Sequence, residues 1–334
     1  MTKHLSLSRR HLIHAGALLG AGLLSGLASL PASAASWPDP SKPVRIIVGF
    51  PPGGGADMLA RTVAPGLADK LGGTVVVENK PGAGGLTATE AVAKSTADGY
   101  TLYIATPGSF TIWPSLRKLN YDPGSDFAAV SLLVTMPNLL VTGPNAPYKD
   151  VAGLITAAKA PGANLSYASG GLGTIGQIAA EQFNTMAKLR VPHVPYKGTA
   201  PALNDVMSGM VPFTFSDPSA KAQIDGGKLR LLAVTTAKRS RLFPDAPTMA
   251  EAGVPGYDVM NWYGLVAPAG TPPEVIQRLN TALTAVMGQT DIRQRLEGGG
   301  MEATSSKPAE FNQLMAAERA KWAALIALIG MKAE

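Results

Sequence analysis

The sequence predicts an α/β protein built from two doubly wound lobes. Short apolar runs rich in β-branched residues alternate with helical patterns, and glycine-rich turns separate many of these segments. Of the 334 residues, 46% are apolar and 16% are charged, with 37 glycines and 27 prolines, which is typical of a globular, loop-rich chain. The alternation indicates largely parallel sheets with helices on both faces.

Residues 1–35 have the pattern of an export signal. Arg9 and Arg10 precede an uncharged run over 15–30, and the small residues 32–34 form an A-x-A cleavage site. The paired arginines favour a twin-arginine signal, and an ordinary secretory signal with two adjacent arginines is the alternative. No later stretch reaches the roughly 18 uninterrupted apolar residues of a spanning helix. We therefore expect a mature chain that works in the periplasm after this segment is removed.

Residue content excludes several classes of protein. The chain has no cysteine, so disulfides, thiolate metal sites and cysteine nucleophiles are excluded. Three of the four histidines lie in the leader, which leaves His193 and excludes a metal site made of several histidines. The leader also holds three of the 29 basic side chains and none of the 23 acidic ones. The rest of the chain is nearly balanced in charge, and we expect no metal, no cofactor and no nucleic-acid partner.

The first set of elements starts with a strand and a helix joined by a glycine-rich turn. The expected segments are a strand over 44–50, a helix over 57–71, a strand over 74–77, a glycine loop at 82–85, a helix to about Lys94 and a strand over 100–105. Pro65 stands inside the first helix, and its missing N–H predicts a kink or a break there.

The rest of the chain repeats this pattern and ends in a helix. The expected segments are helices over 151–160, 177–187 and 201–207 and strands over 165–168, 191–194, 211–215 and 229–234. Near the C-terminus, apolar residues recur at three- and four-residue spacing: Phe311, Leu314, Met315, Trp322, Leu325, Ile326 and Ile329. This stripe indicates a helix that packs in the core.

The first glycine loop, 50–57, lies between a strand and a helix. Its available N–H donors are those of Gly53, Gly54, Gly55, Ala56 and Asp57, because the two preceding residues are prolines. Glycines let the backbone approach a ligand, and a helix N-terminus adds partial positive charge, so the loop suits a carboxylate. A plain tight turn is the alternative. We expect the Asp57 side chain to cap the helix rather than meet a ligand.

Two more glycine loops follow later strands. The second contains Gly82, Ala83, Gly84 and Gly85, and parallel strands would bring it to the same sheet edge as the first. The third, 169–176, contains G-x-G-x-x-G between a strand and a helix, but no acidic residue stands near position 191 to bind a ribose. We therefore interpret the third loop as an anion-accepting helix N-terminus.

Catalytic motifs have little support. Ser115 to Lys118 matches S-x-x-K without its partner motifs, and the chain has no nucleophile elbow and no Walker loop. His193 lies in a short strand between two prolines, where a structural histidine explains the pattern better than a catalytic base. The sequence thus offers anion-binding backbone without evident catalytic chemistry.

Several motifs together resemble one family, the Bug-type extracytoplasmic solute receptors of tripartite tricarboxylate transporters. The similarity extends from Trp37 to Gly330. The motifs that carry it are K-P-V-R-I-I-V at 42–48, P-P-G-G-G-A-D at 51–57, V-E-N-K-P-G-A-G-G at 77–85, D-G-Y-T-L at 98–102, H-V-P-Y-K-G at 193–198, G-K-L-R at 227–230 and W-Y-G-L-V-A-P-A-G-T-P at 262–272.

The resemblance implies a type II periplasmic binding protein, a monomer whose two lobes close around a hinge on a small carboxylate. It implies a first lobe of residues 36–137 and 251–334 and a second lobe of 138–250. Crossings of the chain near 136–140 and 251–263 would form the hinge. The ligand cleft would lie between the lobes.

The resemblance also implies ligand-binding residues. Amides of the two glycine loops of the first lobe would hold the carboxylate, which carries over to 53–57 and 82–85. The candidate residues outside these two loops are Phe50, Thr106, Ser169, Gly173, Thr174, Gln177 and Asp217. Gln177 stands where the family commonly has a histidine, and the Phe-Ser-Asp-Pro run that contains Asp217 also differs from the family pattern.

The function that the resemblance implies is capture of a small carboxylate and its delivery to integral membrane permease subunits. The candidate ligands are di- or tricarboxylates, amino acids and aromatic acids, and rings such as Tyr196 and Trp262 would favour aromatic ones. Two other classes stay open: an exported enzyme that uses the glycine loops and His193, and a ligand sensor for a signalling kinase. The sequence does not identify the ligand, because backbone amides recognise a carboxylate without reading the rest of the molecule.

Overall fold

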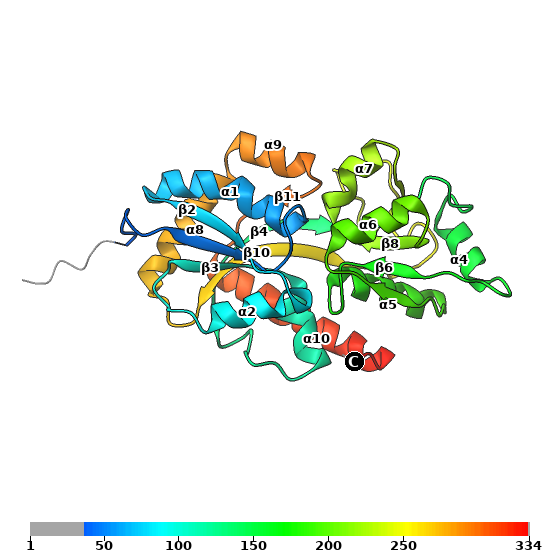
Figure 1. Ribbon diagram of the computed structural model, residues 1–334, viewed down its shortest axis with the longest axis horizontal. Helices are drawn as coiled ribbons and strands as arrows, with labels where there is room; N and C mark the ends of the chain where they lie inside the picture. Colours follow the sequence, from blue (N-terminus) through cyan, green and yellow to red (C-terminus); the bar gives the residue numbers. More distant parts are fainter. Residues whose placement is uncertain (1–36, 333–334) are drawn as a thin grey trace, which may run out of the picture. The chain divides into compact units, whose positions relative to one another are not determined.

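Two mixed β-sheets organise the chain in the computed structural model, which describes residues 37–332 (Figure 1). From Pro40 onward the described chain forms one compact unit. Of the preceding unit, Met1–Asp39, only residues 37–39 are described, and they contain no helix or strand. The predicted export signal over 1–35 therefore lies outside the described residues.

The first sheet has six strands in the order β11-β4-β10-β3-β1-β2. Their bounds are β1 Val44–Val48, β2 Val75–Asn79, β3 Thr101–Ala105, β4 Phe127–Pro137, β10 Met260–Pro268 and β11 Glu302–Ala303. β1 pairs in parallel with β2 and β3, with Arg45 opposite both Val76 and Thr101. The carboxyl ends of these three strands therefore meet at one edge of the sheet, which is where the glycine loops begin.

The second sheet has five strands in the order β7-β6-β8-β5-β9. Their bounds are β5 Leu139–Thr142, β6 Tyr167–Ser169, β7 His193–Pro195, β8 Phe213–Ser216 and β9 Arg230–Val234. β6 pairs in parallel with β7 and β8. We call each sheet, together with the helices that cover it, the first and the second lobe.

The prediction of largely parallel sheets is wrong for part of each sheet. β10 runs antiparallel to β3 and β4, and β5 runs antiparallel to β8 and β9. β5 and β10 are connecting strands: only Asn138 separates β4 from β5, and β10 follows the return of the chain from the second sheet. The short β11, which pairs antiparallel with β4, lies within the first lobe. A strand that enters from the neighbouring lobe is not part of a strand-helix-strand repeat, so it need not follow the direction of that repeat.

Helices cover both faces of the first sheet, with α1 and α9 on one side and α2 and α10 on the other (Figure 1). The bounds are α1 Gly55–Leu71, α2 Leu86–Ala93, α3 Trp113–Leu116, α8 Pro273–Met287, α9 Thr290–Gly298 and α10 Pro308–Ile329. Short turns precede two of them, the 3₁₀ turn η1 Ala83–Gly85 and the π turn η2 Gly108–Ile112. α1 packs on both α8 and α9. A doubly wound lobe is thus confirmed for this part of the chain.

α1 runs without interruption through Pro65, so the prediction of a split helix is wrong. Pro65 is exposed, whereas its neighbours Val63, Ala64 and Leu67 are buried. The hydrogen bond that proline removes therefore lies on the solvent face, where water can satisfy the freed carbonyl and packing of the buried face keeps the helix continuous.

In the second lobe α6 and α7 lie on one side of the sheet and α5 on the other (Figure 1), and α4 packs in the same buried cluster as α5. The bounds are α4 Val151–Lys159, α5 Ile175–Ala187, α6 Thr199–Ser208 and α7 Lys221–Asp225, with the 3₁₀ turn η3 Pro218–Ala220 before α7. One buried cluster joins α4 and α5 to Tyr167, Phe213 and Phe215 of the sheet. A second cluster joins Ala202, Leu203 and Val206 of α6 to the opposite face.

Three segments tie the lobes together around Asn138. The Asn138 N–H donates to Thr235 Oγ1 at 2.7 Å, and the Thr235 hydroxyl donates to the Val259 carbonyl at 2.7 Å. α10 is a further link, because Phe311 and Met315 pack in the first lobe and Trp322 and Ile326 pack in the second. The connection is therefore a set of strands and one helix, and not a single flexible linker.

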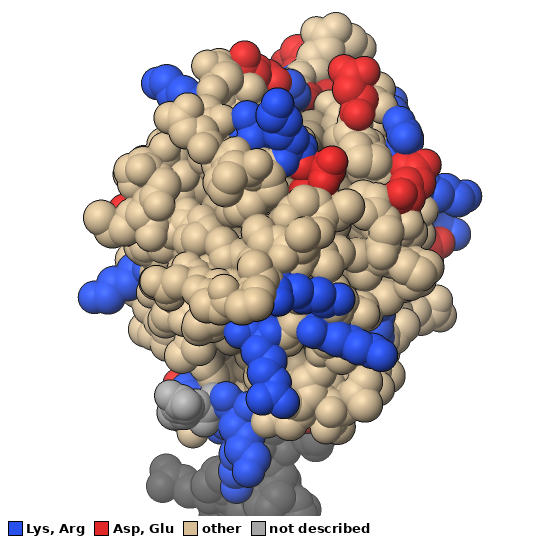
Figure 2. Space-filling model, turned by 90° about the vertical axis from the view of Figure 1, so that its right-hand side faces the viewer, with Lys and Arg blue, Asp and Glu red and all other residues tan. Residues whose placement is uncertain are grey.

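Most charged side chains lie at the surface, whereas Asp57 and Glu318 are buried. Figure 2 views the end of the second lobe and shows Lys and Arg gathered in its lower part, with both signs of charge in its upper part. Asp57, Thr106, Asn138, Gln177 and Asn261 are buried, and each lies at or near the junction of the lobes. Buried polar groups are the informative exceptions to apolar cores, and here they mark the region of the candidate site.

Candidate functional site

A cavity lies between the lobes, at the carboxyl ends of the parallel strands of both sheets. Its lining includes Phe50, Gly54, Gly55, Ala56, Thr106 and Gly108 from the first lobe, Gly170, Thr174, Ile175, Gly176, Gly198, Thr199, Thr214 and Asp217 from the second, and Asn138, Asn261 and Tyr263 from the connecting strands. Its volume is about 80 Å³, and one water molecule needs about 10–15 Å³. The cavity therefore has room for a small organic molecule but not for a dinucleotide.

The first glycine loop lines this cavity, as its position after β1 suggested. Gly54 precedes the first turn of α1, and Gly55 and Ala56 open it. The first N–H groups of a helix have no partner within the helix, so these donors are available to a ligand. A Cβ added to Gly54 would meet no atom closer than the Pro51 carbonyl oxygen at 4.0 Å, which leaves open space beside the backbone.

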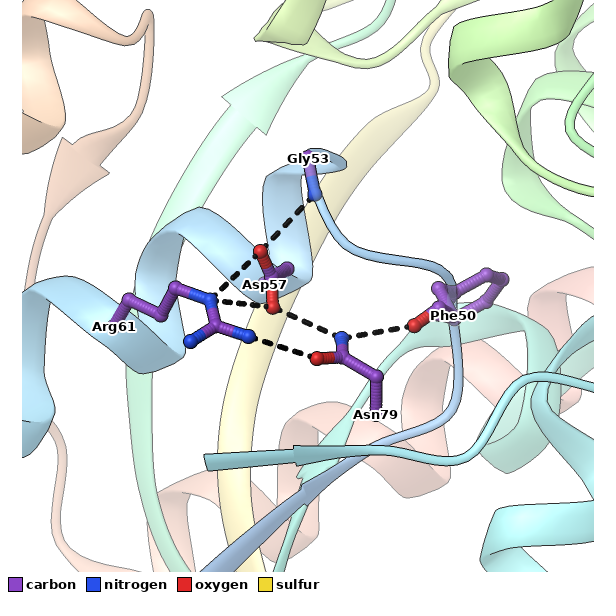
Figure 3. Close-up of polar contacts among 5 residues, drawn as sticks. All are labelled: Phe50, Gly53, Asp57, Arg61 and Asn79. Carbon is purple, nitrogen blue, oxygen red and sulfur yellow. Dashed lines mark hydrogen bonds and ion pairs between the residues drawn. The ribbon is translucent and has the colours of Figure 1, made fainter. Parts of the chain in front are cut away.

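Asp57 does not line the cavity. Its side chain ties the loop to Arg61 and Asn79 (Figure 3). Its carboxylate accepts from the Gly53 N–H at 3.0 Å, from Arg61 Nε at 3.0 Å and from Asn79 Nδ2 at 2.9 Å. Burial alone would raise the pKa of Asp57, but these hydrogen bonds outweigh it and lower the pKa below its usual value. Asp57 is thus a structural carboxylate that fixes the loop, although Gly54 and not Asp57 is the N-cap residue.

The second glycine loop does not line the cavity. A Cβ added to Gly84 would lie 2.7 Å from the carbonyl oxygen of Leu172 in the second lobe and 3.1 Å from Trp113 Nε1. Gly82 faces the Thr87 side chain, and Gly85 faces Tyr103 and Phe50. The missing side chain at Gly84 thus allows the backbone of one lobe to approach the other, and a ligand contact through this loop stays a prediction.

The third loop divides between the cavity and the junction of the lobes. Gly170, Thr174 and Gly176 line the cavity, and α5 begins at Ile175 with its free N–H groups at the same place. Gly173 packs against the first lobe, because a Cβ there would lie 2.3 Å from Trp113 Nε1. The Thr174 hydroxyl donates to the Gly171 carbonyl at 2.8 Å and makes no side-chain cap of α5.

Ser169, Gln177 and His193 form a hydrogen-bonded network behind the cavity. Gln177 Oε1 accepts from the Gly173 N–H at 2.7 Å, so its Nε2 faces His193 Nδ1 at 3.2 Å as a donor. His193 Nδ1 therefore accepts, and the proton on Nε2 is donated to Ser169 Oγ at 2.6 Å. None of the three lines the cavity, and a ligand contact of Ser169 or Gln177 stays a prediction.

This network resembles a catalytic triad only in composition. A serine nucleophile needs an imidazole nitrogen that accepts its proton, whereas here the ring donates to the serine. Ser169 Oγ also donates to the Gly171 carbonyl at 3.0 Å. Burial lowers the pKa of His193 to about 4, so the ring is neutral at pH 7. The arrangement holds the third loop in place, which agrees with a structural histidine.

α6 supplies a third helix N-terminus that sequence reasoning missed. Gly198, Thr199 and Ala200 line the cavity, and Gly198 is the N-cap residue. Residues 193–198 form one of the motifs that carry the family resemblance, but they contain a single glycine and therefore did not predict a helix N-terminus at a ligand site. Its Gly198 N–H donates to the Gly170 carbonyl at 3.0 Å, which ties it to the third loop. The N-termini of α1, α5 and α6 thus converge on one cavity.

The connecting strands supply further polar groups that the sequence did not reveal. Asn138 Oδ1 accepts from Asn261 Nδ2 at 3.3 Å, but Asn138 Nδ2 has no hydrogen-bond partner although it is buried. Thr106 Oγ1, in the first lobe, is also buried without a partner. Both residues line the cavity, and an unpaired buried polar atom in such a place is a site for a ligand group or a water.

Asp217 and Tyr263 meet across the two lobes at one side of the cavity. The Tyr263 hydroxyl lies 3.3 Å from Asp217 Oδ2, and the Thr199 hydroxyl lies 3.4 Å from the same oxygen. Burial raises the pKa of Tyr263 well above its usual value, and the neighbouring Asp217 raises it further, so the phenol stays a proton donor. Trp262 and Tyr196, which the sequence suggested as cleft rings, do not line the cavity.

The described residues contain no group of three or more His, Cys, Asp or Glu side chains placed to hold a metal ion. In residues 37–332, no helix has the length and apolar character needed to cross a membrane. Among the described residues that line the cavity there is no lysine, arginine or histidine. The arrangement can therefore bind an anion through N–H groups and helix ends, without a cationic side chain.

Two lobes joined by crossing strands around a cavity of hydrogen-bond donors define a solute-binding protein. The chain belongs to the family of tripartite tricarboxylate transporter receptors, whose sequence model matches residues 59–331. It is 33% identical to the protein BugT of Bordetella pertussis over 322 residues, which covers 95% of this chain and 97% of BugT. The resemblance to Bug-type receptors is thereby confirmed.

Solved structures agree with this assignment. The chain is similar to Rpa4515 of R. palustris with adipate, at 38% identity and a TM-score of 0.85 over 89% of this chain and 99% of that one. It is similar to MatC from Rhodopseudomonas palustris with bound malate, at 32% identity and a TM-score of 0.82 over 86% and 100%. It is also similar to the periplasmic binding protein BugD, at 32% identity and a TM-score of 0.84 over 89% and 100%.

These similarities confirm the predicted receptor fold. They also decide between a solute receptor and an exported enzyme, two of the three classes that the sequence left open. The family and its solved members are solute-binding receptors, so the chain is a receptor and not an enzyme. This agrees with the tautomer of His193 and with the size of the cavity.

Proposed function

We propose that this receptor captures a small carboxylate in the cavity between its lobes and delivers it to the membrane permease of a tripartite tricarboxylate transporter. The observation that carries the proposal is the convergence of the N-termini of α1, α5 and α6 on that cavity. Each helix N-terminus is equivalent to roughly half an elementary positive charge and presents free N–H donors. A carboxylate is the biological group that such a site suits best when no cationic side chain is present.

The proposed ligand site uses residues from both lobes, so closure of the lobes and binding are coupled. In the first lobe it comprises the amides of 54–56 together with Phe50 and Thr106. In the second it comprises Thr174, Thr199 and the neighbouring amides. A ligand that contacts both lobes stabilises the closed arrangement over an open one by its differential affinity, and the permease can read that difference.

The ligand class is proposed from the cavity and from similar receptors. Adipate occupies the Rpa4515 structure and malate occupies the MatC structure. A cavity of about 80 Å³ holds several groups the size of a water molecule, each of which needs about 10–15 Å³, and this favours small acids. We therefore propose an aliphatic acid of a few carbons rather than a nucleotide or a large aromatic acid.

A thermal-shift screen followed by calorimetry tests the binding step. The purified protein is heated with aliphatic dicarboxylates, citrate, amino acids, benzoate and NAD, and the ligand is recovered afterwards and analysed. We expect a saturable rise in Tm of several degrees with small aliphatic acids, and complete recovery of the acid. Stabilisation by NAD alone, or no stabilisation by any acid, would contradict the proposal.

Delivery is tested in cells. Deletion of the gene for this receptor should abolish uptake of the radiolabelled ligand identified in the screen, and a plasmid copy should restore it. A receptor that only signals to a kinase would leave uptake intact while changing gene expression. Retained uptake in the deletion strain, with the transporter expressed, would therefore contradict the transport role.

We further propose that residues 1–35 direct export to the periplasm through the twin-arginine route, and that the mature receptor is a monomer. Replacing both Arg9 and Arg10 by lysine should leave the precursor uncleaved inside the cell, because that route depends on the arginine pair. Unchanged export of this variant would indicate the general secretory route.

Light scattering of the exported protein measures its oligomeric state.

We also propose a first lobe of residues 36–137 and 251–334 and a second of 138–250. The boundary can be refined, because Val254, Tyr257 and Val259 are buried with residues of the second sheet. This packing favours a return crossing close to Met260, where β10 begins.

A further inference from the structure

The two carboxylate oxygens of Asp217 differ in their hydrogen bonds. Oδ1 accepts from the Ser219 N–H at 3.0 Å and from the Ser219 hydroxyl at 2.5 Å. Oδ2 has only the Tyr263 and Thr199 hydroxyls, at 3.3 and 3.4 Å. A good O–H···O hydrogen bond is about 2.5–3.0 Å long, so both of these contacts are weak. Oδ2 therefore keeps the capacity to accept a shorter hydrogen bond from a ligand.

The charge of Asp217 is unbalanced at the cavity. Among the described residues that line the cavity, Asp217 is the only Asp, Glu, Lys, Arg or His. A second carboxylate of a ligand placed beside Oδ2 would meet a like charge in a place partly shielded from water. An ammonium group at the same place would meet an opposite charge and a free acceptor.

The position of Asp217 also limits where that ammonium group sits on the ligand. A Cβ added to Gly55 would lie 3.3 Å from Asp217 Oδ2, so this oxygen is next to the first turn of α1. The same turn carries the free N–H groups proposed to hold the ligand carboxylate. A ligand that satisfies both places needs its amine and its carboxylate on the same or neighbouring carbon atoms.

We propose that Asp217 Oδ2 accepts from an ammonium group of the ligand, and that the preferred ligand of this receptor is an amino acid rather than an unsubstituted dicarboxylate. This inference rests on the proposed function, because it assumes that a carboxylate occupies the cavity. It assigns Asp217 as the residue that selects among small acids of similar size. The unpaired Asn138 Nδ2 and Thr106 Oγ1 are then donors for the remaining oxygens of the ligand.

A series of four-carbon acids tests the proposal with one change at a time. Succinate, L-malate and L-aspartate differ only in hydrogen, hydroxyl or ammonium on one carbon. Calorimetric titration of the purified protein should give an affinity for L-aspartate roughly tenfold to hundredfold above that for succinate, the range of a hydrogen bond to a charged group. Glutarate and L-glutamate repeat the comparison with one more carbon, in case the four-carbon acids are too short.

Two variants test whether Asp217 causes the preference for amino acids. Asp217→Asn keeps an oxygen that can accept from Ser219 and removes the charge, and it should reduce the amino acid preference to threefold or less while succinate binds as well or better. The control Asp245→Asn removes the charge of an exposed residue outside the cavity, and it should keep the preference of the unmodified protein. Melting temperatures of both variants report whether they fold.

The outcomes separate the two proposals. Equal or weaker binding of the amino acids in the unmodified protein, or an unchanged preference in Asp217→Asn, would overturn the role of Asp217 while carboxylate binding stands. A preference for L-malate that Asp217→Asn removes would overturn the amino group and identify a hydroxyl acid. Failure of every acid to bind would instead overturn the proposed function.

Discussion

Two glycine loops of the first lobe have nearly the same composition and different surroundings. The loop at 53–55 has open space beside Gly53 and Gly54 and lines the cavity. The loop at 82–85 faces the second lobe, with the place of a Gly84 Cβ only 2.7 Å from the Leu172 carbonyl oxygen. Glycine permits close approach in both cases, but a ligand would approach the first loop and the polypeptide itself approaches the second.

This difference teaches that glycine-rich loops at one sheet edge need not share a role. Gly173 and Gly108 repeat the second behaviour, since a Cβ on Gly108 would lie 2.9 Å from the Gly173 carbonyl oxygen. Backbone packed against backbone across the lobes sets how closely they approach. We call the loop at 53–55 the cavity loop and the loop at 82–85 the contact loop. They should contribute to binding in separate ways, and substitutions can distinguish the two contributions.

The largest expected effect on ligand affinity comes from a substitution in the loop at 53–55. Gly54→Val introduces a side chain at a residue with φ of −84°, which L-residues adopt without strain, and no atom lies within 4 Å except the Pro51 carbonyl at 4.0 Å. The fold should tolerate it, whereas a ligand should lose roughly hundredfold in affinity because its space is filled. Calorimetry measures the affinity and thermal melting measures the fold.

The matched control for this substitution is Gly298→Val. Gly298 ends α9, does not line the cavity and also has no atom within 4 Å of an added Cβ. Its affinity should stay within about twofold of the unmodified protein, since surface changes away from a site have small effects. Equal affinity of Gly54→Val and Gly298→Val would show that the first loop does not bind the ligand.

A smaller effect is expected at the contact loop. Gly84→Ala combines a backbone φ of +65° with a Cβ 2.7 Å from the Leu172 carbonyl oxygen. It should lower the free energy of unfolding by about 1–2 kcal/mol and weaken binding roughly tenfold, because the lobes can no longer approach as closely. Chemical denaturation and calorimetry measure the two quantities.

Gly227→Ala separates backbone strain from the contact between lobes. Gly227 has a φ of +67° and no atom within 4 Å of an added Cβ. It should lose similar stability from the left-handed backbone but keep full affinity. If Gly84→Ala also keeps full affinity, the contact between the second and third loops has no part in binding.

The loop at 169–176 is held by His193, so the pH dependence of stability tests its role. The folded-state pKa of His193 is lowered to about 4, below the 6.5 of an exposed histidine. Above pH 6.5 both states are neutral, and as pH falls from 6.5 to 4 the unfolded state takes up the proton and stability is lost. At pH 5 the loss should be about 1–2 kcal/mol after allowance for partial exposure. His193→Gln should lack this component, as denaturation at pH 7.5 and pH 5 would reveal.

The smallest expected effect concerns an unpaired hydroxyl of the cavity. Thr106→Val replaces a buried Oγ1 that has no partner with a methyl group of similar size. Stability without ligand should be equal or slightly higher, whereas affinity should fall about threefold to tenfold if the hydroxyl bonds the ligand. Unchanged affinity would remove Thr106 from the binding site and leave it as a residue of the lining only.

Much of the first lobe could be predicted from local pattern. The strand over 44–50, the first glycine loop and the helix after it follow from alternation of apolar residues and from glycine punctuation, and the structure has β1 and α1 there. The antiparallel directions of β10 in the first sheet and β5 in the second could not be predicted in this way. They depend on which lobe each strand comes from, which local spacing does not encode.

The candidate site was only partly visible in the sequence for the same reason. Asn138 joins β4 to β5 and Asn261 lies in β10, and neither belongs to a sequence motif. Tyr263 lies in the motif at 262–272, but nothing in that motif indicates a cavity residue, and Thr199 opens a helix with no glycine run before it. Conversely, Gln177 and Ser169 stand in a glycine motif yet bond to His193 behind the cavity. Motifs report local backbone freedom, whereas a site between lobes is assembled from segments distant in sequence.

The sequence by itself determined the α/β class, the donors at the start of the first helix, the exclusion of cysteine and multi-histidine chemistry, and the resemblance to a receptor family. These properties depend on residue type and on spacings within one or two elements, where backbone geometry is short-ranged. Only the tertiary structure decided that one glycine loop lines a cavity while another meets the opposite lobe, that three helix N-termini converge, and that Asp217 stands beside the first turn of α1. These depend on how the chain crosses between the two sheets and packs there, because a contact across lobes is set by the whole arrangement and not by the residues on either side of it in sequence.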